Sequence, residues 1–306
     1  MNEGTGQAEG ISIHFDKILF ATDFSPASAT ALPYVAAIVR RFNSQLWIVH
    51  IVSSREFEDT AEQQGVDPFT RVRQNAETPI TALLNSTPFK DIPHHMLLER
   101  GEVMSTLSRL ADEHAIDLIA AGTHGPHGLQ KLVSGSTAEE IQRLARRPVL
   151  LVGPDVATDP QAEVNIERIL FATDFRPESR FALEYAYALA RAYAAHLIIL
   201  HVVDNPLDEP LATRMSGEAF CRLRMLETKW PERRQSIEPE FVLEFGSRQQ
   251  WTLDTIAKRD VQLLVLSAPR TAHPLLKSHL PGPLTYDIIT HSRCPVITIR
   301  AEQSPT

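Results

Sequence analysis

The sequence predicts an α/β protein made of two tandem, doubly wound domains with parallel sheets. One observation is an internal duplication: residues 17–25 (KILFATDFS) return as residues 168–176 (RILFATDFR), with seven of nine positions identical. Another is that short apolar runs alternate with longer stretches of helical spacing inside each copy. The length of 306 residues also suits two domains.

The duplication extends over a whole domain, because further matching segments follow in the same order. They pair LWIVHIVSS (46–54) with LIILHVVDN (197–205), LERGE (98–102) with LEFGS (243–247), and ARRPVLLV (145–152) with SRCPVITI (292–299). A short solenoid unit does not give this pattern. We expect a disordered tail over 1–14, a first domain over 15–153, a linker over 154–165 and a second domain over 166–301.

Five short runs in the first copy predict parallel strands. Each is apolar at nearly every position, as expected of strands that are covered on both faces of a sheet. The runs are KILFA (17–21), QLWIVHIV (45–52), HMLLE (95–99), DLIAAG (117–122) and PVLLV (148–152).

Helical spacing lies between these strands. Ser25 is a predicted N-cap with Pro26 at the first helical position, and Pro33 is expected to kink the helix that follows. Two further helices are predicted over 102–114 and 136–145. Strand and helix in alternation favour right-handed βαβ units, which place ligands outside the carboxyl ends of the strands.

One loop at such an end has the features of a phosphate cradle. Gly122 and Gly125 follow the fourth strand, and nine residues later Gly135, Ser136 and Thr137 open the last helix. Glycines let the backbone approach an anion closely. Free N–H groups and hydroxyls at a helix start attract negative charge, although a serine there also serves as an ordinary N-cap.

A second loop follows the first strand as Ala21-Thr22-Asp23. The carboxylate of Asp23 could accept a hydrogen bond from an adenine amino group or a sugar hydroxyl. A simple turn-forming role for Asp23 is the alternative.

Together the motifs A-T-D and G-x-x-G-x9-G-S/T resemble the ATP-binding branch of the universal stress protein superfamily, over nearly the entire chain. The resemblance implies a Rossmann-like fold, similar to the adenine nucleotide alpha hydrolases, with five parallel strands in the order 3-2-1-4-5. In that family the last strand pairs with the last strand of a second domain. We therefore expect an intramolecular pseudo-dimer, while further association into a homodimer stays open.

The same resemblance implies a bound ATP or ADP, with Mg²⁺ reaching the site on the phosphates near Ser136 rather than through protein ligands. Asp23 would contact adenine, with Ala21 and Thr22 beside it, and the backbone of Ile51 would contact adenine from the second strand. The glycine loop would hold ribose and phosphates through Gly122, Gly125, Gly135, Ser136 and Thr137, and His124 would reach a phosphate.

The second copy departs from this pattern. Thr173 and Asp174 are retained, but Ser267 and Arg270 stand where the first two loop glycines are expected, and Gly282-Pro283 replaces Gly135-Ser136. Proline has no N–H to donate to a phosphate. We predict that the second copy has lost ATP binding and serves as a structural or regulatory half.

The chemistry of the site favours binding over fast turnover. The first copy has no Walker-type lysine after its glycines, so the sequence predicts a nucleotide-dependent stress-response or signalling module with an unknown protein partner. A slow ATPase or a related nucleotide-hydrolysing enzyme is the first alternative, and a scaffold that binds no nucleotide is the second.

Composition also bears on partners and cellular location. A net charge of −8 disfavours broad contact with nucleic acid, and no run is long enough to span a membrane. The polar start of the sequence and the two separated cysteines, Cys221 and Cys294, suit a cytoplasmic address. Phe220, Met215 and Met225 are expected to pack in the core.

Overall fold

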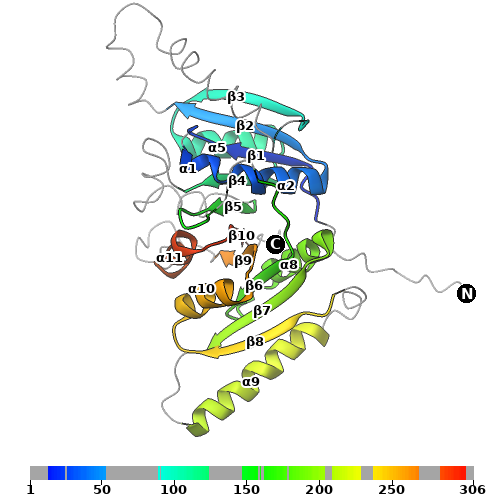
Figure 1. Cartoon of the computed structure of the whole chain (residues 1–306), viewed down its shortest axis with the longest axis vertical. Coiled ribbons are helices and arrows are strands. Elements are labelled where there is room, and N and C mark those ends of the chain that lie inside the picture. The colour runs from blue at the N-terminus through cyan, green and yellow to red at the C-terminus, as the bar shows by residue number, and fades with distance from the viewer. Residues whose placement is uncertain are drawn as a thin grey trace, which may run out of the picture.

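A computed structural model of the chain describes residues 13–24, 26–52, 89, 91–123, 147–157, 159, 162–177, 179–203, 209–228, 237–268 and 283–300 (Figure 1). The elements of the first half are β1 (Lys17–Ala21), α1 (Pro26–Ala29), α2 (Leu32–Phe42), β2 (Gln45–Val52), β3 (His94–Arg100), α5 (Val103–Glu113), β4 (Leu118–Gly122) and β5 (Val149–Val152). Those of the second half are β6 (Arg168–Thr173), α8 (Ser179–Tyr193), β7 (His196–Val203), α9 (Glu209–Thr228), β8 (Glu240–Phe245), α10 (Arg248–Arg259), β9 (Leu263–Ala268), α11 (Pro283–His291) and β10 (Val296–Arg300).

All ten strands belong to one sheet, in the order β3-β2-β1-β4-β5-β10-β9-β6-β7-β8. Each half has the predicted order 3-2-1-4-5, and every pair within a half is parallel. The two halves meet through β5 and β10, which pair antiparallel. The predicted α/β fold is confirmed, and so is the predicted pseudo-dimer formed within one chain.

Both faces of this sheet are buried under helices. Alternate residues of each strand enter two separate cores, so that Ile18 and Phe20 of β1 lie in one and Leu19 and Ala21 in the other. The first core also contains α2 and α8, and the second contains α5, α10 and α11. Because helices cover both faces of the sheet, the strands are apolar at nearly every position.

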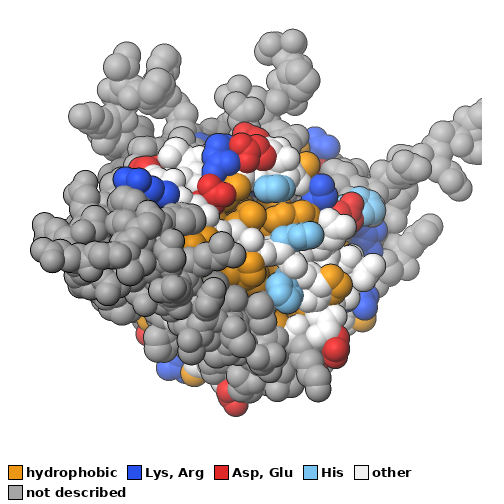
Figure 2. Space-filling view, turned by 90° about the horizontal axis from the view of Figure 1, so that it is seen from above, with side chains coloured by type: hydrophobic (Ala, Val, Ile, Leu, Met, Phe, Trp, Pro, Cys, Tyr) orange, Lys and Arg blue, Asp and Glu red, His pale blue; other side chains and the backbone are white. Residues whose placement is uncertain are grey.

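The outermost strands differ from the others, since β3 and β8 are only partly buried along most of their length. Figure 2 looks from above onto the end of the molecule where β3 lies, and it shows apolar and histidine side chains beside one another on that surface. Here the prediction of strands covered on both faces was too general.

The first predicted helix is divided in two rather than kinked. α1 ends at Ala29 and α2 begins at Leu32, with Pro33 in its first turn. Pro33 lacks an N–H to continue the preceding helical turns, whereas at the start of a new helix that donor is not needed. Ser25, the predicted N-cap, and the helix predicted over 136–145 lie outside the described residues.

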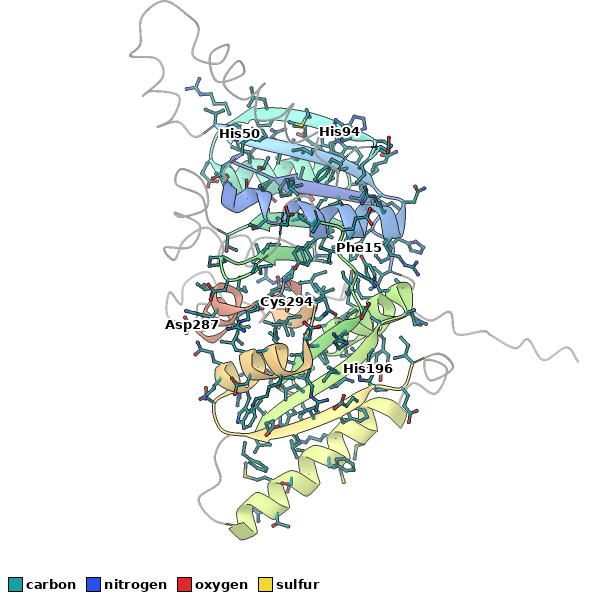
Figure 3. All side chains as sticks on the ribbon, viewed as in Figure 1. Phe15, His50, His94, His196, Asp287 and Cys294 are labelled. Carbon is teal, nitrogen blue, oxygen red and sulfur yellow. The ribbon has the colours of Figure 1, made fainter. Side chains whose placement is uncertain are left out.

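Aromatic side chains pack across the junction of the two halves. Phe15 is buried, and its ring lies 5.0 Å from that of Phe42 in α2 and 6.2 Å from that of Tyr185 in α8. Phe42 also meets Tyr193 edge-on at 6.3 Å. Figure 3 shows Phe15 between the ribbons of the first and second halves. The junction therefore has its own hydrophobic contacts in addition to the β5–β10 ladder.

The expectation that Phe220 and Met225 pack in the core is wrong. Both project from α9 with exposed fractions of 49% and 54%, while Ala219 supplies the buried side of that helix. α9 covers the outer end of the sheet at β7 and β8 (Figure 1). Among the described residues, no helix combines the length and apolar character needed to cross a membrane.

Candidate functional site

The carboxyl ends of β1, β2 and β4 converge in the first half. Ala21 is paired with Val49 of β2 on one side and with Ala121 of β4 on the other. Thr22 therefore follows β1 between His50 of β2 and Gly122 of β4, at the point where the strand order reverses. Such a point is where open α/β sheets bind their ligands.

Five of the predicted site residues belong to this convergence. Ala21, Thr22, Ile51 and Gly122 lie at or next to strand ends, and Asp23 extends from the loop after β1 with its Oδ2 atom buried. The other five lie outside the described residues. They are His124, Gly125, Gly135, Ser136 and Thr137.

Thr22 organises the turn after β1. Its N–H donates to the Val49 carbonyl at 3.0 Å, and its Oγ1 accepts the N–H of Phe24 at 3.0 Å. Phe24 adopts a left-handed backbone, with φ of 58°. That conformation is uncommon for a bulky residue and costs about 1–3 kcal/mol. It persists only where the surrounding contacts offset this cost. Asp23 therefore lies in a tight turn that these hydrogen bonds hold in place.

His50 of β2 contacts the same turn after β1. Its Nδ1 lies 2.9 Å from the carbonyl oxygen of Thr22, and its ring lies 4.9 Å from the ring of Phe24. A carbonyl only accepts hydrogen bonds, so Nδ1 carries the proton and donates. His50 is only 9% exposed, and its position in β2 is visible in Figure 3.

The second half repeats this unit. Thr173 Oγ1 accepts the N–H of Phe175 at 3.1 Å, and Phe175 has φ of 59°. His201 places Nδ1 2.8 Å from the Thr173 carbonyl, with its ring 4.1 Å from that of Phe175. We call these four positions the Thr-Asp-Phe-His unit, which is Thr22, Asp23, Phe24 and His50 in the first half and Thr173, Asp174, Phe175 and His201 in the second.

The aspartate of the second unit is bound within its own loop. Asp174 Oδ1 accepts from the backbone N–H of Arg176 at 3.1 Å and from Ser179 Oγ at 2.8 Å. Its Oδ2 pairs with Arg176 Nε at 3.1 Å. In the first half the hydroxyl of Ser28, the counterpart of Ser179, lies 2.9 Å from the hydroxyl of Thr22. The two aspartates therefore differ in what surrounds them.

Burial and charge also lower the pKa of His201. Removal from solvent is the main cause, and the cationic Arg248 and Arg222 act in the same direction. The hydrogen bond to Thr173 and the charge of Asp174 oppose this shift. The His201 ring is therefore favoured in its neutral form.

The start of the glycine loop is held against β5. Gly122 pairs with Val152 in the parallel ladder, and the N–H of Thr123 donates to the Val152 carbonyl at 2.9 Å. In the second half the same place in the ladder is taken by Ser267, which pairs with Ile299. Ser267 has a side chain at the position where Gly122 has none.

The described part of the chain contains neither a cluster of metal ligands nor a pair of neighbouring cysteines. Within it, no group of three or more His, Cys, Asp or Glu residues could hold a metal ion. Cys294 is buried, which raises the pKa of its thiol to about 12 and keeps it protonated. Cys221 is exposed and has no second described cysteine beside it.

Sequence reasoning missed the two histidines of the Thr-Asp-Phe-His units. A signal for them existed, because His50 and His201 occupy the same position in the duplicated second strand. The partner of His50 is the carbonyl of Thr22, which becomes adjacent only when β1 and β2 pair.

Comparison with known proteins agrees with the duplicated architecture. The model of the Universal stress protein family matches residues 14–153 and again residues 165–300. Universal stress protein A homolog 1 from Coxiella burnetii is 32% identical over 143 residues, which cover 46% of this chain and 97% of that protein. Universal stress protein MJ0577 from Methanocaldococcus jannaschii is 23% identical over 167 residues, with 46% and 97% covered.

A solved structure shares the two-half arrangement. A universal stress protein from Archaeoglobus fulgidus matches 94% of this chain and 97% of its own, with a TM-score of 0.71 and 18% identity. Another universal stress protein, solved in complex with cAMP, matches 46% of this chain with 20% identity and a TM-score of 0.33. Since the family model matches both halves, the chain belongs to the universal stress protein family and contains two of its domains in tandem.

Proposed function

We propose that the first half binds one adenine nucleotide, ATP or ADP, and that the chain acts as a nucleotide-dependent stress-response or signalling module. The observation that supports this most directly is the convergence of Thr22, Asp23, Ile51 and Gly122 at the strand-order reversal. Asp23 would accept from the adenine amino group, and the backbone of Ile51 would contact the ring. Ala21 and Thr22 would lie beside Asp23 at this site.

The phosphates would extend toward the glycine loop that begins at Gly122. In this proposal Gly125, Gly135, Ser136 and Thr137 hold ribose and phosphates, and His124 reaches a phosphate. Mg²⁺ would be carried by the phosphates near Ser136, where it would offset their charge. The proposed domains remain 15–153 and 166–301, joined by the linker 154–165.

The second half is proposed not to bind the nucleotide. Both carboxylate oxygens of Asp174 are already engaged by Arg176 and Ser179, so an adenine amino group would have to displace a local ion pair. The sequence change from Gly135-Ser136 to Gly282-Pro283 removes an N–H donor as well. One nucleotide per chain is the expected stoichiometry.

Isothermal titration of the full chain with ATP and Mg²⁺ tests this proposal. We expect one site per chain, and Asp23→Ala should weaken binding about 10- to 100-fold, since a hydrogen bond to a charged group contributes about 1.5–3 kcal/mol. Asp174→Ala is the matched control and should leave the affinity unchanged. Two sites per chain, or equal effects of the two substitutions, would contradict the proposal.

A further inference from the structure

Gly153 lies where the last strand of the first half meets the last helix of the second. It directly follows β5 and is buried. A Cβ atom placed on Gly153 would lie 2.3 Å from the backbone carbonyl oxygen of Ile289 in α11. No side chain can be accommodated at that distance without movement of one backbone. The backbones of the two halves therefore touch here, and only glycine permits the contact.

The residue before Gly153 is tied to the proposed site. The Val152 carbonyl accepts from the N–H of Thr123 at 2.9 Å and from its Oγ1 hydroxyl at 3.2 Å. Thr123 is 3% exposed and follows Gly122, the first glycine of the predicted loop. Two hydrogen bonds to one carbonyl thus join the start of that loop to the strand that touches α11.

The α11 side of this contact is also held in place by its neighbours in the chain. α11 begins at Pro283, next to the residue that aligns with Gly135, so it is the second half's counterpart of the helix predicted after the phosphate loop. Its other end leads through a buried turn, in which Ser292 Oγ donates to the Cys294 carbonyl at 2.6 Å, into β10. β10 in turn pairs with β5. Figure 3 shows Cys294 and the labelled Asp287 of α11 in this central region.

We propose that the end of β4 at Gly122 and Thr123, which belongs to the proposed nucleotide site, is coupled to α11 of the second half through Val152 and Gly153. Close-packed protein interiors have low compressibility and transmit strain. A nucleotide bound at Gly122 that displaces the end of β4 also displaces the end of β5, and the Ile289 carbonyl, which touches Gly153, must move with it. This inference rests on the proposed function and adds a regulatory role to it. The packing of α11 then depends on whether a nucleotide is bound to the first half.

Hydrogen exchange of the full chain, with and without ATP and Mg²⁺, tests the coupling. ATP is expected to slow exchange of the amides in 283–291 about fivefold or more, the lower end of ordinary allosteric couplings. Gly153→Ala should abolish that ATP-dependent change. Gly217→Ala in α9 is the matched control, because a Cβ there meets nothing within 4 Å, and it should preserve the change.

A second measurement needs no ligand. If the contact is mechanical, Gly153→Ala should speed exchange of the Thr123 amide relative to Gly217→Ala, since the shift of β5 strains its bond to Val152. Should Gly153→Ala fail to fold, Thr123→Val provides the alternative. It removes the hydroxyl bond to Val152 without adding an atom near α11, and should reduce the ATP-dependent protection of 283–291.

The outcomes separate the two proposals. ATP binding without any change in the exchange of 283–291 would overturn the coupling and leave the proposed function intact. Absence of ATP binding by titration would overturn the proposed function, and the coupling with it. An equal ATP response in Gly153→Ala and Gly217→Ala would show that Gly153 does not transmit the signal, and would also overturn the coupling.

Discussion

The two halves share one turn but surround its aspartate differently. In both, a threonine hydroxyl supports a left-handed phenylalanine and a histidine donates to the threonine carbonyl. In the first half the Asp23 carboxylate is half-buried, at the reversal of the strand order. In the second, Asp174 is exposed and is held by Arg176 and Ser179, so it caps its own loop.

This difference shows which part of the duplicated motif serves the fold. The Oγ1 atoms of Thr22 and Thr173 accept from the backbone N–H of Phe24 and Phe175, and these two bonds support the turns that follow β1 and β6. The carboxylate contributes nothing to those bonds. A retained aspartate is therefore a weak marker of a ligand site, and its neighbours decide what it can bind.

The largest effect is expected at the junction that makes the two halves one unit. Phe15→Ala should lower the free energy of unfolding by about 3–5 kcal/mol, because the ring is buried between Phe42 and Tyr185 and its loss leaves a cavity. Urea denaturation should show one transition shifted for both halves. Phe220→Ala is the control, since that ring is 49% exposed and its loss should change stability by less than about 0.5 kcal/mol. A separate transition for each half would show that the junction does not link them.

A middle-sized effect is expected when the arginine of the second unit is moved into the first. Ser25 aligns with Arg176, so Ser25→Arg should let a guanidinium compete for the Asp23 carboxylate and weaken ATP binding about tenfold, or about 1.4 kcal/mol. Titration with ATP measures the change. The reverse substitution, Arg176→Ser, should leave affinity at the first half as it was. Unchanged binding by Ser25→Arg would mean that Arg176 does not explain the difference between the halves.

The smallest effect concerns pH. The pKa of His201 is lower in the folded chain than its unfolded value of about 6.5, so the unfolded chain binds more protons in that range. Stability is then complete above about pH 6.5 and falls as the pH drops toward the folded pKa. Urea denaturation at pH 7.5 and 5.5 should show this loss, and His201→Gln should reduce it. A loss of the same size in His201→Gln would assign the pH dependence to other groups.

Much of the fold was predictable because its signals are local. Strand runs such as residues 17–21 are apolar at every position that two helical layers cover, and the helix predicted over 102–114 is observed as Val103–Glu113. The break before Pro33 also follows from the chemistry of one residue. Errors arose where solvent exposure depends on distant elements, as at Phe220 and Met225, whose helix has only one side to bury against the sheet.

The candidate site was predictable only in part. Strand ends indicate that Ala21, Thr22, Asp23 and Gly122 lie at one edge, because parallel strands share their carboxyl ends, and the structure has them there. The binding roles of these residues and of Ile51 stay predictions. The role of His50 required the pairing of β1 with β2, and the capture of Asp174 required the geometry of a single loop. The remaining predicted residues, from His124 to Thr137, stay predictions.

By itself the sequence determined the duplication, the order of strands and helices, and the turn chemistry of the Thr-Asp-Phe segments. These depend on periodicity and on neighbours within a few residues, which any chain of this sequence carries with it. Only the tertiary structure decided that β5 and β10 join two sheets into one, that Gly153 abuts α11, and that His50 donates to the Thr22 carbonyl. Such contacts depend on side-chain packing between segments far apart in the chain, and no local pattern encodes their distances.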